Sequence, residues 1–208
     1  MAKPQVAHRN NYAFIDSQNL NLGVQKMGWK MDWRRFREFL RTQYGVERAY
    51  MFIGYIHDNE EMYKKLYDMG YLIVLKPTVE SFVEQPHETE AVATAPEGAA
   101  TESKPTEEPA KRTSIIKGNI DAELVLYAMK EIRQYDKAVI VSGDGDFFCL
   151  VEYLAEQQKL QNILVPNWQF SGLYKQFEEY IVRLDQKRGQ LSYREGRRFF
   201  GRKPKQQS

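Results

Sequence analysis

The sequence predicts an α/β fold with a doubly wound, mainly parallel central sheet and helices on both faces. Short apolar runs, rich in β-branched and aromatic residues, alternate with segments whose apolar residues recur every three or four positions. The runs are typical of strands that are covered on both faces, and the segments are typical of amphipathic helices. Their alternation favours parallel strands joined by right-handed crossovers in a Rossmann-like, three-layer arrangement.

Five apolar runs are predicted to form strands of this sheet. They are "YAFID" (12–16), "AYMFIGY" (49–55), "YLIVL" (71–75), "AVIVSG" (138–143) and "NILVP" (162–166). In the segments between these runs, apolar residues recur every three or four positions, which predicts helices. These residues are Trp33, Phe36, Leu40 and Tyr44, then Met62, Leu66 and Met69, then Leu124, Ala128 and Ile132, and then Leu150 and Leu154. Near the C-terminus, "GLYKQFEEY" (172–180) predicts a final helix and "YIVRL" (180–184) a last strand.

The chain length suits one domain, and the charges are segregated into two appendages. Residues 80–110 contain eight acidic residues and one basic residue, so we expect a disordered acidic insertion at about 80–112. Residues 187–205 contain eight basic residues and one acidic residue. The sequence therefore predicts an N-terminal extension (1–11), a domain over 12–185 that the insertion interrupts, and a basic C-terminal tail (186–208).

The sequence also bears on the cellular compartment. A single cysteine, Cys149, cannot form an internal disulfide, and the N-terminus lacks the apolar core of a secretory signal. No apolar run approaches the ~20 residues that are needed to cross a bilayer. We therefore expect a cytoplasmic protein without membrane segments, and the sequence leaves a monomer and a homodimer both open.

Four aspartates are predicted to meet at one edge of the sheet. Asp16 ends the first strand, Asp144 and Asp146 follow the strand "AVIVSG", and Asp121 heads the core-facing stripe of a helix that starts near Asn119. The carboxyl ends of the strands form the rim where such sheets bind ligands. Carboxylates are ligands that Mg²⁺ and Mn²⁺ prefer, and two such ions can promote in-line displacement at phosphorus. The pattern therefore predicts a divalent-cation site with nuclease chemistry.

Each acid also has an ordinary structural explanation. Asp144 or Asp146 can cap the following helix, Asp121 suits the first turn of a helix because of the macrodipole, and Asp16 can form an Asx-turn. For any one acid, capping is the simpler interpretation. The coincidence of all four on one predicted rim is what favours a metal site.

Other familiar chemistries lack their motifs. The chain has no G-x-x-x-x-G-K-[ST] phosphate loop, and no G-x-G-x-x-G follows the first strand. "SQN" follows Asp16, where phosphatases that resemble haloacid dehalogenases carry a second aspartate two residues on. The three histidines, His8, His57 and His87, are scattered, so with one cysteine there is no zinc constellation.

Three motifs carry a family resemblance. "YAFIDSQNL", "KGNIDAELVLYAM" and "VSGDGDF" resemble, in this order, the D-x-x-N, K-G-x-x-D and S-G-D-x-D-F motifs of the NYN domain family in the PIN-like ribonuclease superfamily. The resemblance extends from Tyr12 to about Leu184. It implies a PIN-like α/β fold and cleavage of RNA that depends on Mg²⁺ or Mn²⁺, with the four aspartates at the acidic centre and with Asn19 and Ser142 as supporting polar residues.

Two functions from different classes follow. In the first, the chain is a metal-dependent endoribonuclease in which the aspartates hold the cation and Lys117 approaches the scissile or adjacent phosphate. In the second, it is a non-catalytic RNA-binding or regulatory module that retains the fold. The presence of all four acids favours the first.

The basic tail has a composition that suits single-stranded RNA, because its cations can contact phosphates and its aromatic rings can stack on unpaired bases. The predicted RNA-binding residues are Arg194, Arg197, Arg198, Phe199, Phe200, Arg202 and Lys203. A tail that only aids solubility, docks an acidic partner or packs its phenylalanines on the domain is an equal alternative.

Overall fold

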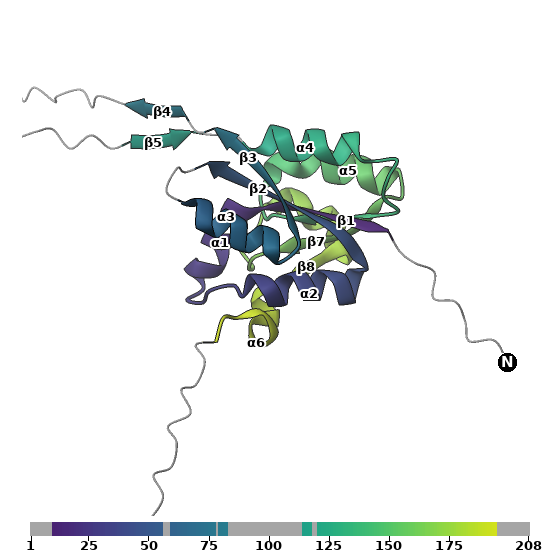
Figure 1. Cartoon of the computed structure of the whole chain (residues 1–208). Coiled ribbons are helices and arrows are strands. Elements are labelled where there is room, and N and C mark those ends of the chain that lie inside the picture. Colours follow the sequence, from purple (N-terminus) through teal and green to yellow (C-terminus); the bar gives the residue numbers. More distant parts are fainter. Residues whose placement is uncertain (1–9, 56–58, 78, 83–113, 118–119, 195–208) are drawn as a thin grey trace, which may run out of the picture.

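A six-stranded, all-parallel sheet forms the centre of the molecule in a computed structural model that describes residues 10–55, 59–77, 79–82, 114–117 and 120–194 (Figure 1). The strand order is β3-β2-β1-β6-β7-β8. The strands are β1 (Asn11–Asp16), β2 (Val46–Tyr55), β3 (Tyr71–Pro77), β6 (Ala138–Val141), β7 (Leu160–Val165) and β8 (Ile181–Arg183). This architecture confirms the predicted α/β fold.

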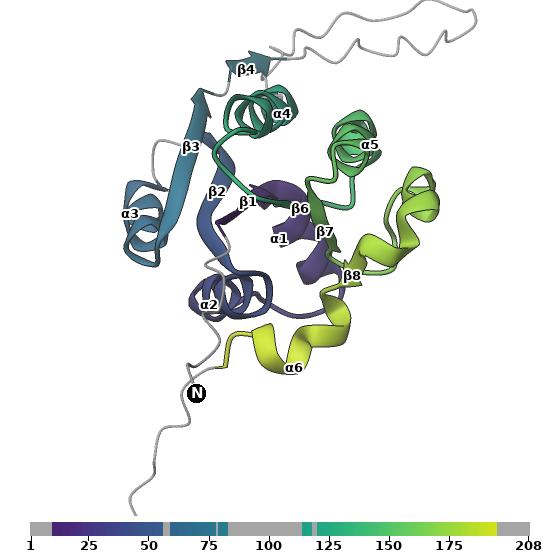
Figure 2. The same cartoon turned by 90° about the vertical axis from the view of Figure 1, so that its right-hand side faces the viewer.

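Helices cover both faces of the sheet, with α2 and α6 on one side and α4 and α5 on the other (Figure 2). The α-helices are α1 (Ser17–Lys26), α2 (Trp33–Tyr44), α3 (Glu60–Asp68), α4 (Asp121–Lys130), α5 (Phe148–Glu156) and α6 (Arg188–Leu191). The 3₁₀ segments that lie wholly within the described residues are η2 (Gly145–Phe147), η3 (Gly172–Tyr180) and η4 (Asp185–Lys187). Among the described residues, no helix combines the length and the apolar character that crossing a bilayer requires.

The core consists of two apolar layers, one on each face of the sheet. In β1, Ala13 and Ile15 pack into the layer that includes Leu20 of α1, whereas Tyr12 and Phe14 pack into the opposite layer. Successive side chains of a strand point to opposite faces, so a strand buried on both faces must be apolar throughout. This is why the strands read in the sequence as continuous apolar runs.

The strand order reverses between β1 and β6. The chain begins in the middle of the sheet at β1, proceeds outward through β2 to β3, and then crosses back to β6 on the other side of β1. Both neighbours pair with β1 in parallel, and Ile15 lies opposite Val141 of β6. In open α/β sheets, ligands bind at the carboxyl ends of the strands at this kind of switch point.

Helix α1 was not predicted, because its sequence "SQNLNLGVQK" is mostly polar. Only Leu20 and Val24 are fully buried, and they are spaced by four residues as one helical face requires. Two other elements differ from expectation. The strand predicted over 138–143 ends at Val141, and the helix predicted over 172–180 is a 3₁₀ segment with a kink at Phe177.

A two-stranded antiparallel sheet precedes α4. It pairs β4 (Val79–Phe82) with β5 (Ser114–Lys117), and Phe82 lies opposite Ser114. The first residues of the predicted acidic insertion therefore belong to a strand. The rest of that prediction, from residue 83 onward, and most of the predicted N-terminal extension lie outside the described residues.

The first part of the predicted tail folds onto the domain. Leu191 of α6 is fully buried, and its carbonyl oxygen accepts a hydrogen bond of 2.8 Å from the backbone N–H of Asp32. The backbone N–H of Tyr193 donates to the carbonyl of Lys30 at 2.9 Å. The ordered domain thus continues past residue 185 to at least residue 194, and the tail from 195 onward lies outside the described part.

Candidate functional site

Asp16 stands where β1 ends and α1 begins, directly at the switch point. Its Oδ1 accepts a hydrogen bond of 3.0 Å from the backbone N–H of Asn19, and its Oδ2 accepts one of 3.0 Å from the Ser142 hydroxyl. The side chain is buried, with 9% of the residue exposed. Burial raises the pKa of this carboxyl, and the nearby charge of Asp144 raises it further, although the hydrogen bonds favour the charged form.

The loop after β6 is tied to the beginning of α1. The amide N–H of Gly143 donates to Oδ1 of Asn19 at 2.9 Å, and the amide N–H of Asp144 donates to the Ser142 hydroxyl oxygen at 3.1 Å. Asn19 and Ser142 thus connect two strand ends that are more than 120 residues apart in sequence. These hydrogen bonds fix the backbone on both sides of the switch point.

Asp144 caps the short segment η2, and Asp146 is the second residue of that segment. The Oδ1 of Asp144 accepts a hydrogen bond of 3.1 Å from the amide N–H of Asp146. Asp144 is half-buried, whereas Asp146 is exposed. Asp16 and Asp144 are therefore both capping residues, as the simpler interpretation expects, and both also lie at the carboxyl ends of the central strands.

Asp121, the first residue of α4, shares this region with the other three acids. Its pKa is raised by partial burial and then by the charges of Asp16, Asp144 and Asp146, while Lys76 acts in the opposite direction. Helix α4 packs against β1, which Asp16 ends, and against η2, which Asp144 caps, so the four acids lie in one region. The structure thus brings together, at one rim, residues from three separated segments.

The chemistry of these side chains fits a hard divalent cation, which prefers carboxylate oxygens. A cation would also balance the neighbouring negative charges that, after burial, contribute to the raised pKa of Asp16 and of Asp121. Within the described residues, however, no group of three or more His, Cys, Asp or Glu side chains is gathered closely enough to hold a metal ion. The donor atoms suit a metal, and their arrangement is not that of a preassembled site.

A neighbouring segment, residues 166–173, borders the loop that carries Asp144, and we call it the rim segment. A Cβ added to Gly143 would lie 3.4 Å from Cδ of Pro166 and 3.3 Å from Cβ of Phe170. A Cβ added to Gly145 would lie 2.5 Å from Oγ of Ser171. The sequence interpretation missed this segment. The signal was a pair of glycines beside the acids, because glycine allows such close approach.

Tyr174, just after the rim segment, is also part of the site. Its hydroxyl donates a hydrogen bond to the carbonyl oxygen of Asp144, and its ring is fully buried. Burial raises the pKa of Tyr174, and the charges of Asp144, Asp16 and Asp146 raise it further. The residue therefore remains a neutral donor that holds the backbone of the acidic loop.

The other predicted site residues are placed only in part. Lys117 ends β5, and its side chain is outside the described part of the chain. Arg194 is exposed, and its Nη2 donates a hydrogen bond of 2.7 Å to the carbonyl oxygen of Gly189. The remaining predicted tail residues lie outside the described residues; they are Arg197, Arg198, Phe199, Phe200, Arg202 and Lys203.

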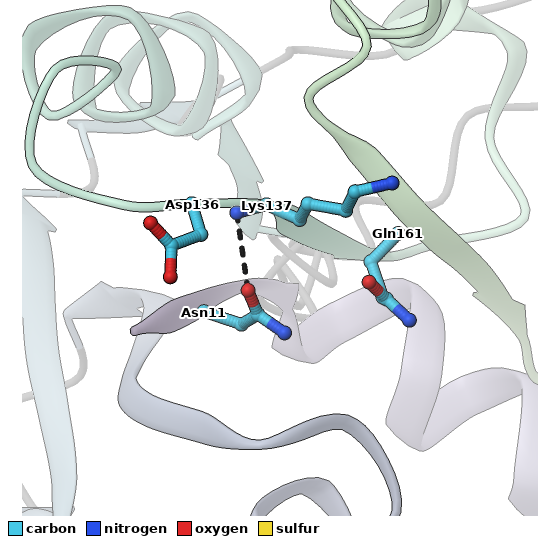
Figure 3. Close-up of a pocket in the computed structure, with 4 residues that line it drawn as sticks. All are labelled: Asn11, Asp136, Lys137 and Gln161. Carbon is cyan, nitrogen blue, oxygen red and sulfur yellow. Dashed lines mark hydrogen bonds between the residues drawn. The ribbon is translucent and has the colours of Figure 1, made fainter. Parts of the chain in front are cut away.

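A cavity of about 330 Å³ lies at the opposite edge of the sheet, where the strands begin (Figure 3). Asn11, Asp136, Lys137 and Gln161 line it. The Asn11 side chain accepts a hydrogen bond of 3.1 Å from the backbone N–H of Lys137 and donates one of 2.6 Å to the carbonyl of Tyr44. This cavity is separate from the acidic centre, and its buried asparagine joins the starts of neighbouring strands.

The raised pKa of Asp16 leads to a prediction about stability and pH. Because the folded state disfavours the charged carboxyl, ionisation of Asp16 destabilises the fold. This penalty develops as the pH rises from 3.8, the ordinary pKa of the carboxyl, through its raised pKa in the folded state. Asp16→Asn keeps an oxygen for the Asn19 amide, so we expect this variant to melt at a higher temperature than wild type at pH 7 in EDTA. The difference in melting temperature between Asp16→Asn and wild type should shrink on acidification and vanish below about pH 3.8.

Thermal unfolding between pH 3 and pH 8 measures this difference, with the exposed Asp68→Asn as the matched control. A lower melting temperature for Asp16→Asn at pH 7 would show that the hydrogen bonds to the ionised form outweigh burial and repulsion.

Comparisons with known proteins identify the family and the fold of this chain. The family model described as "NYN domain" matches residues 12–184. The low amplitude and bright protein LabA of Synechococcus elongatus is 26% identical over 149 residues, which cover 70% of this chain and 67% of that protein. A crystal structure of a protein of unknown function from Vibrio parahaemolyticus shares the fold, with a TM-score of 0.51 and 21% identity over 77% of this chain and 83% of the other. Because the family model matches most of its length, this chain belongs to the NYN domain family.

Proposed function

We propose that this chain is a Mg²⁺- or Mn²⁺-dependent endoribonuclease that hydrolyses phosphodiester bonds of single-stranded RNA. Its family suggests a nuclease-like, RNA-related function. The single observation that carries the finer proposal is the grouping of acids at the switch point, where Asp16 ends β1, Asp144 and Asp146 follow β6, and Asp121 begins α4, which packs against β1 and η2. Four carboxylates in one region are electrostatically unfavourable unless a cation or protons balance them.

The chain's own residues would hold and orient this centre. Asp16 is fixed through both oxygens by the Asn19 amide and the Ser142 hydroxyl, and Asp144 is fixed by the Asp146 amide. Such partners of metal-binding side chains orient the ligands and tune their affinity. When bound, a divalent cation supplies the positive charge that stabilises the attacking and leaving oxygens of an in-line displacement at phosphorus.

Positive side chains near this rim would help to hold the phosphate. Lys76, at the end of β3, forms an ion pair of 2.8 Å with Glu123, and its charge partly offsets the rise in the pKa of Asp121 that burial and the neighbouring acids cause. We assign to Lys117, two residues before Asn119, the approach to the scissile or adjacent phosphate. The pairing of β4 with β5 brings the backbone of Lys117 opposite that of Val79, close to the end of β3.

Metal dependence tests the proposal. A cation that binds only the folded state stabilises it by about 2.7 kcal/mol at a concentration of 100 times Kd, which for a chain of this size raises the melting temperature by roughly 5–10 °C. We expect this shift with Mg²⁺ or Mn²⁺, and we expect EDTA to abolish cleavage of a labelled single-stranded RNA. A melting temperature that ignores millimolar metal, together with cleavage in EDTA, would contradict the proposal.

One observation favours a second candidate function, a non-catalytic RNA-binding or regulatory module. Among the described residues, the acids are not gathered into a ready-made metal site. If this state persists in the presence of a cation, the protein binds RNA without cutting it. RNA binding without cleavage at any Mg²⁺ or Mn²⁺ concentration would support the module and exclude the nuclease.

The basic tail is proposed to strengthen RNA binding. Truncation after Arg194 keeps Leu191 and its contacts with α2, and it removes five basic residues: Arg197, Arg198, Arg202, Lys203 and Lys205. If all five contact phosphates, the slope of log K against log salt should fall in magnitude by about 3.5. We expect weaker binding with a flatter salt dependence, measured by fluorescence anisotropy between low and high salt. An unchanged slope would show that the tail has no part in RNA capture.

A further inference from the structure

Trp168 lies at the middle of the rim segment, and we propose that its indole is a stacking platform for an unpaired RNA base beside the phosphate that is held at the acidic centre. This inference rests on the proposed function and names how that site would recognise single-stranded substrate. Nothing in the family motifs includes Trp168, which follows the last buried residues after β7.

The position of Trp168 is fixed by the residues on both sides. Pro166 and Phe170, two residues before and two residues after it, both approach Gly143 closely enough to contact a Cβ there. Two residues of chain span at most about 7 Å. Trp168 is therefore held close to Gly143, the residue immediately before Asp144.

Buried polar contacts hold the backbone around Trp168. The side chain of Asn167, which is only 4% exposed, donates a hydrogen bond of 2.9 Å to the carbonyl of Gly23 and accepts one of 2.7 Å from the amide of Gln169. The residues immediately before and after Trp168 are thus joined to each other and to α1. A binding side chain on a backbone fixed in this way loses little entropy when a ligand arrives.

The indole itself is left in solvent. Trp168 is 57% exposed, whereas Trp29 is 6% exposed and Trp33 is packed against the core. Leu173, which lies against Gly145, is also 54% exposed. Exposed apolar residues that are scattered singly need no explanation. What distinguishes Trp168 is its place on a fixed segment that borders the acidic loop.

The chemistry of this surface suits a nucleobase. The acidic centre repels phosphates unless a cation is bound, so affinity for RNA must also come from contacts that do not depend on charge. Stacking of a base on an aromatic ring provides such a contact, and it tolerates any base because each has a π-face. A base in a duplex is already stacked and paired, so an indole at this position selects single strands.

Fluorescence anisotropy with a labelled oligouridylate tests the proposal. The Asp144→Asn protein in Mg²⁺ serves as the background, so that the RNA stays intact. Loss of one stacked base weakens binding by roughly 5- to 150-fold. We expect this loss for Trp168→Ala and recovery of most of the affinity for Trp168→Phe. The slope against salt should not change, because no charge is removed.

Tyr67 provides the matched control. It is 66% exposed, and it lies near the end of α3, close to the start of β3 and therefore at the opposite edge of the sheet. Tyr67→Ala should bind single-stranded RNA as the background protein does. A duplex of the same sequence should bind the Trp168→Ala protein and its background equally.

A second measurement uses the fluorescence of the indole itself. RNA should quench the exposed tryptophan, and the quenching should be lost in Trp168→Phe although RNA still binds. Unchanged affinity of Trp168→Ala for single strands, or an equal loss on the duplex, would overturn the inference. A change of oligomeric state between wild type and Trp168→Ala would also overturn the inference, because the indole would then be a contact between copies of the chain.

These measurements are independent of cleavage. A wild-type protein that binds RNA and quenches but does not cut it would overturn the endoribonuclease and support the platform. If the wild-type protein cuts RNA and Trp168→Ala binds RNA as tightly as its background, the endoribonuclease is supported and the stacking platform is overturned.

Discussion

Asp144→Asn is expected to keep its fold and to lose RNA cleavage by more than about 100-fold. Replacement of groups that merely support a metal ligand costs 10- to 100-fold, so loss of a direct carboxylate ligand should cost more. The fold should survive because the asparagine Oδ1 can still accept the hydrogen bond from the Asp146 amide. Tyr174 should still hold the backbone carbonyl of residue 144.

Initial rates of cleavage of a labelled RNA in Mg²⁺ or Mn²⁺ measure this effect, with thermal unfolding as the check on folding. Asp68→Asn, an exposed change in the last residue of α3, should cleave as wild type does. If Asp144→Asn cleaves at the wild-type rate, then Asp144 is only a capping residue of η2, and the acidic centre has a different composition from the one proposed here.

Gly23→Ala is expected to destabilise the protein by about 1–3 kcal/mol, which for this chain length lowers the melting temperature by roughly 2–12 °C. A Cβ at Gly23 would lie 2.4 Å from Cβ and 2.7 Å from Cγ of the buried Pro166. Both atoms belong to a rigid ring, so α1 or the rim segment must move. Alanine favours a helix more than glycine by up to about 1 kcal/mol, and this gain only partly offsets the clash.

The matched control is Gly189→Ala in α6, where an added Cβ meets nothing within 4 Å. That variant should unfold at or slightly above the wild-type temperature. Wild-type stability of Gly23→Ala would show that the proline ring can retreat from the helix. In that case the hydrogen bond from the Asn167 side chain to the carbonyl of residue 23 should survive with a changed geometry.

The sheet could be predicted from the sequence because each strand is buried on both faces. The runs at 12–16, 49–55 and 71–75 lie within the strands that form there, and the run at 138–143 contains β6. Helix α1 was not predicted because it buries only Leu20 and Val24, which leaves too few apolar residues to show a helical period. Its start was nevertheless visible, because an aspartate at residue 16 followed by a polar first turn is typical of an N-cap.

The candidate site could be predicted only as far as strand ends determine it. Asp16 and Asp144 follow strands, so parallel pairing brings them to one rim. The rim segment escaped prediction because its place depends on contacts between residues far apart in the chain, such as Asn167 with Gly23. No periodicity marks such contacts, and the orientation of Trp168 follows from them.

The central place of β1 has a consequence for how the protein is made. Strand β1 can complete its pairing only when β6, more than 120 residues later in the sequence, has been synthesised. Asp16 then gains its contact with Ser142, and the acidic region comes into being only at that stage. A partly translated chain therefore holds its acids apart. Any activity that requires all four acids is therefore delayed until synthesis has passed Asp146.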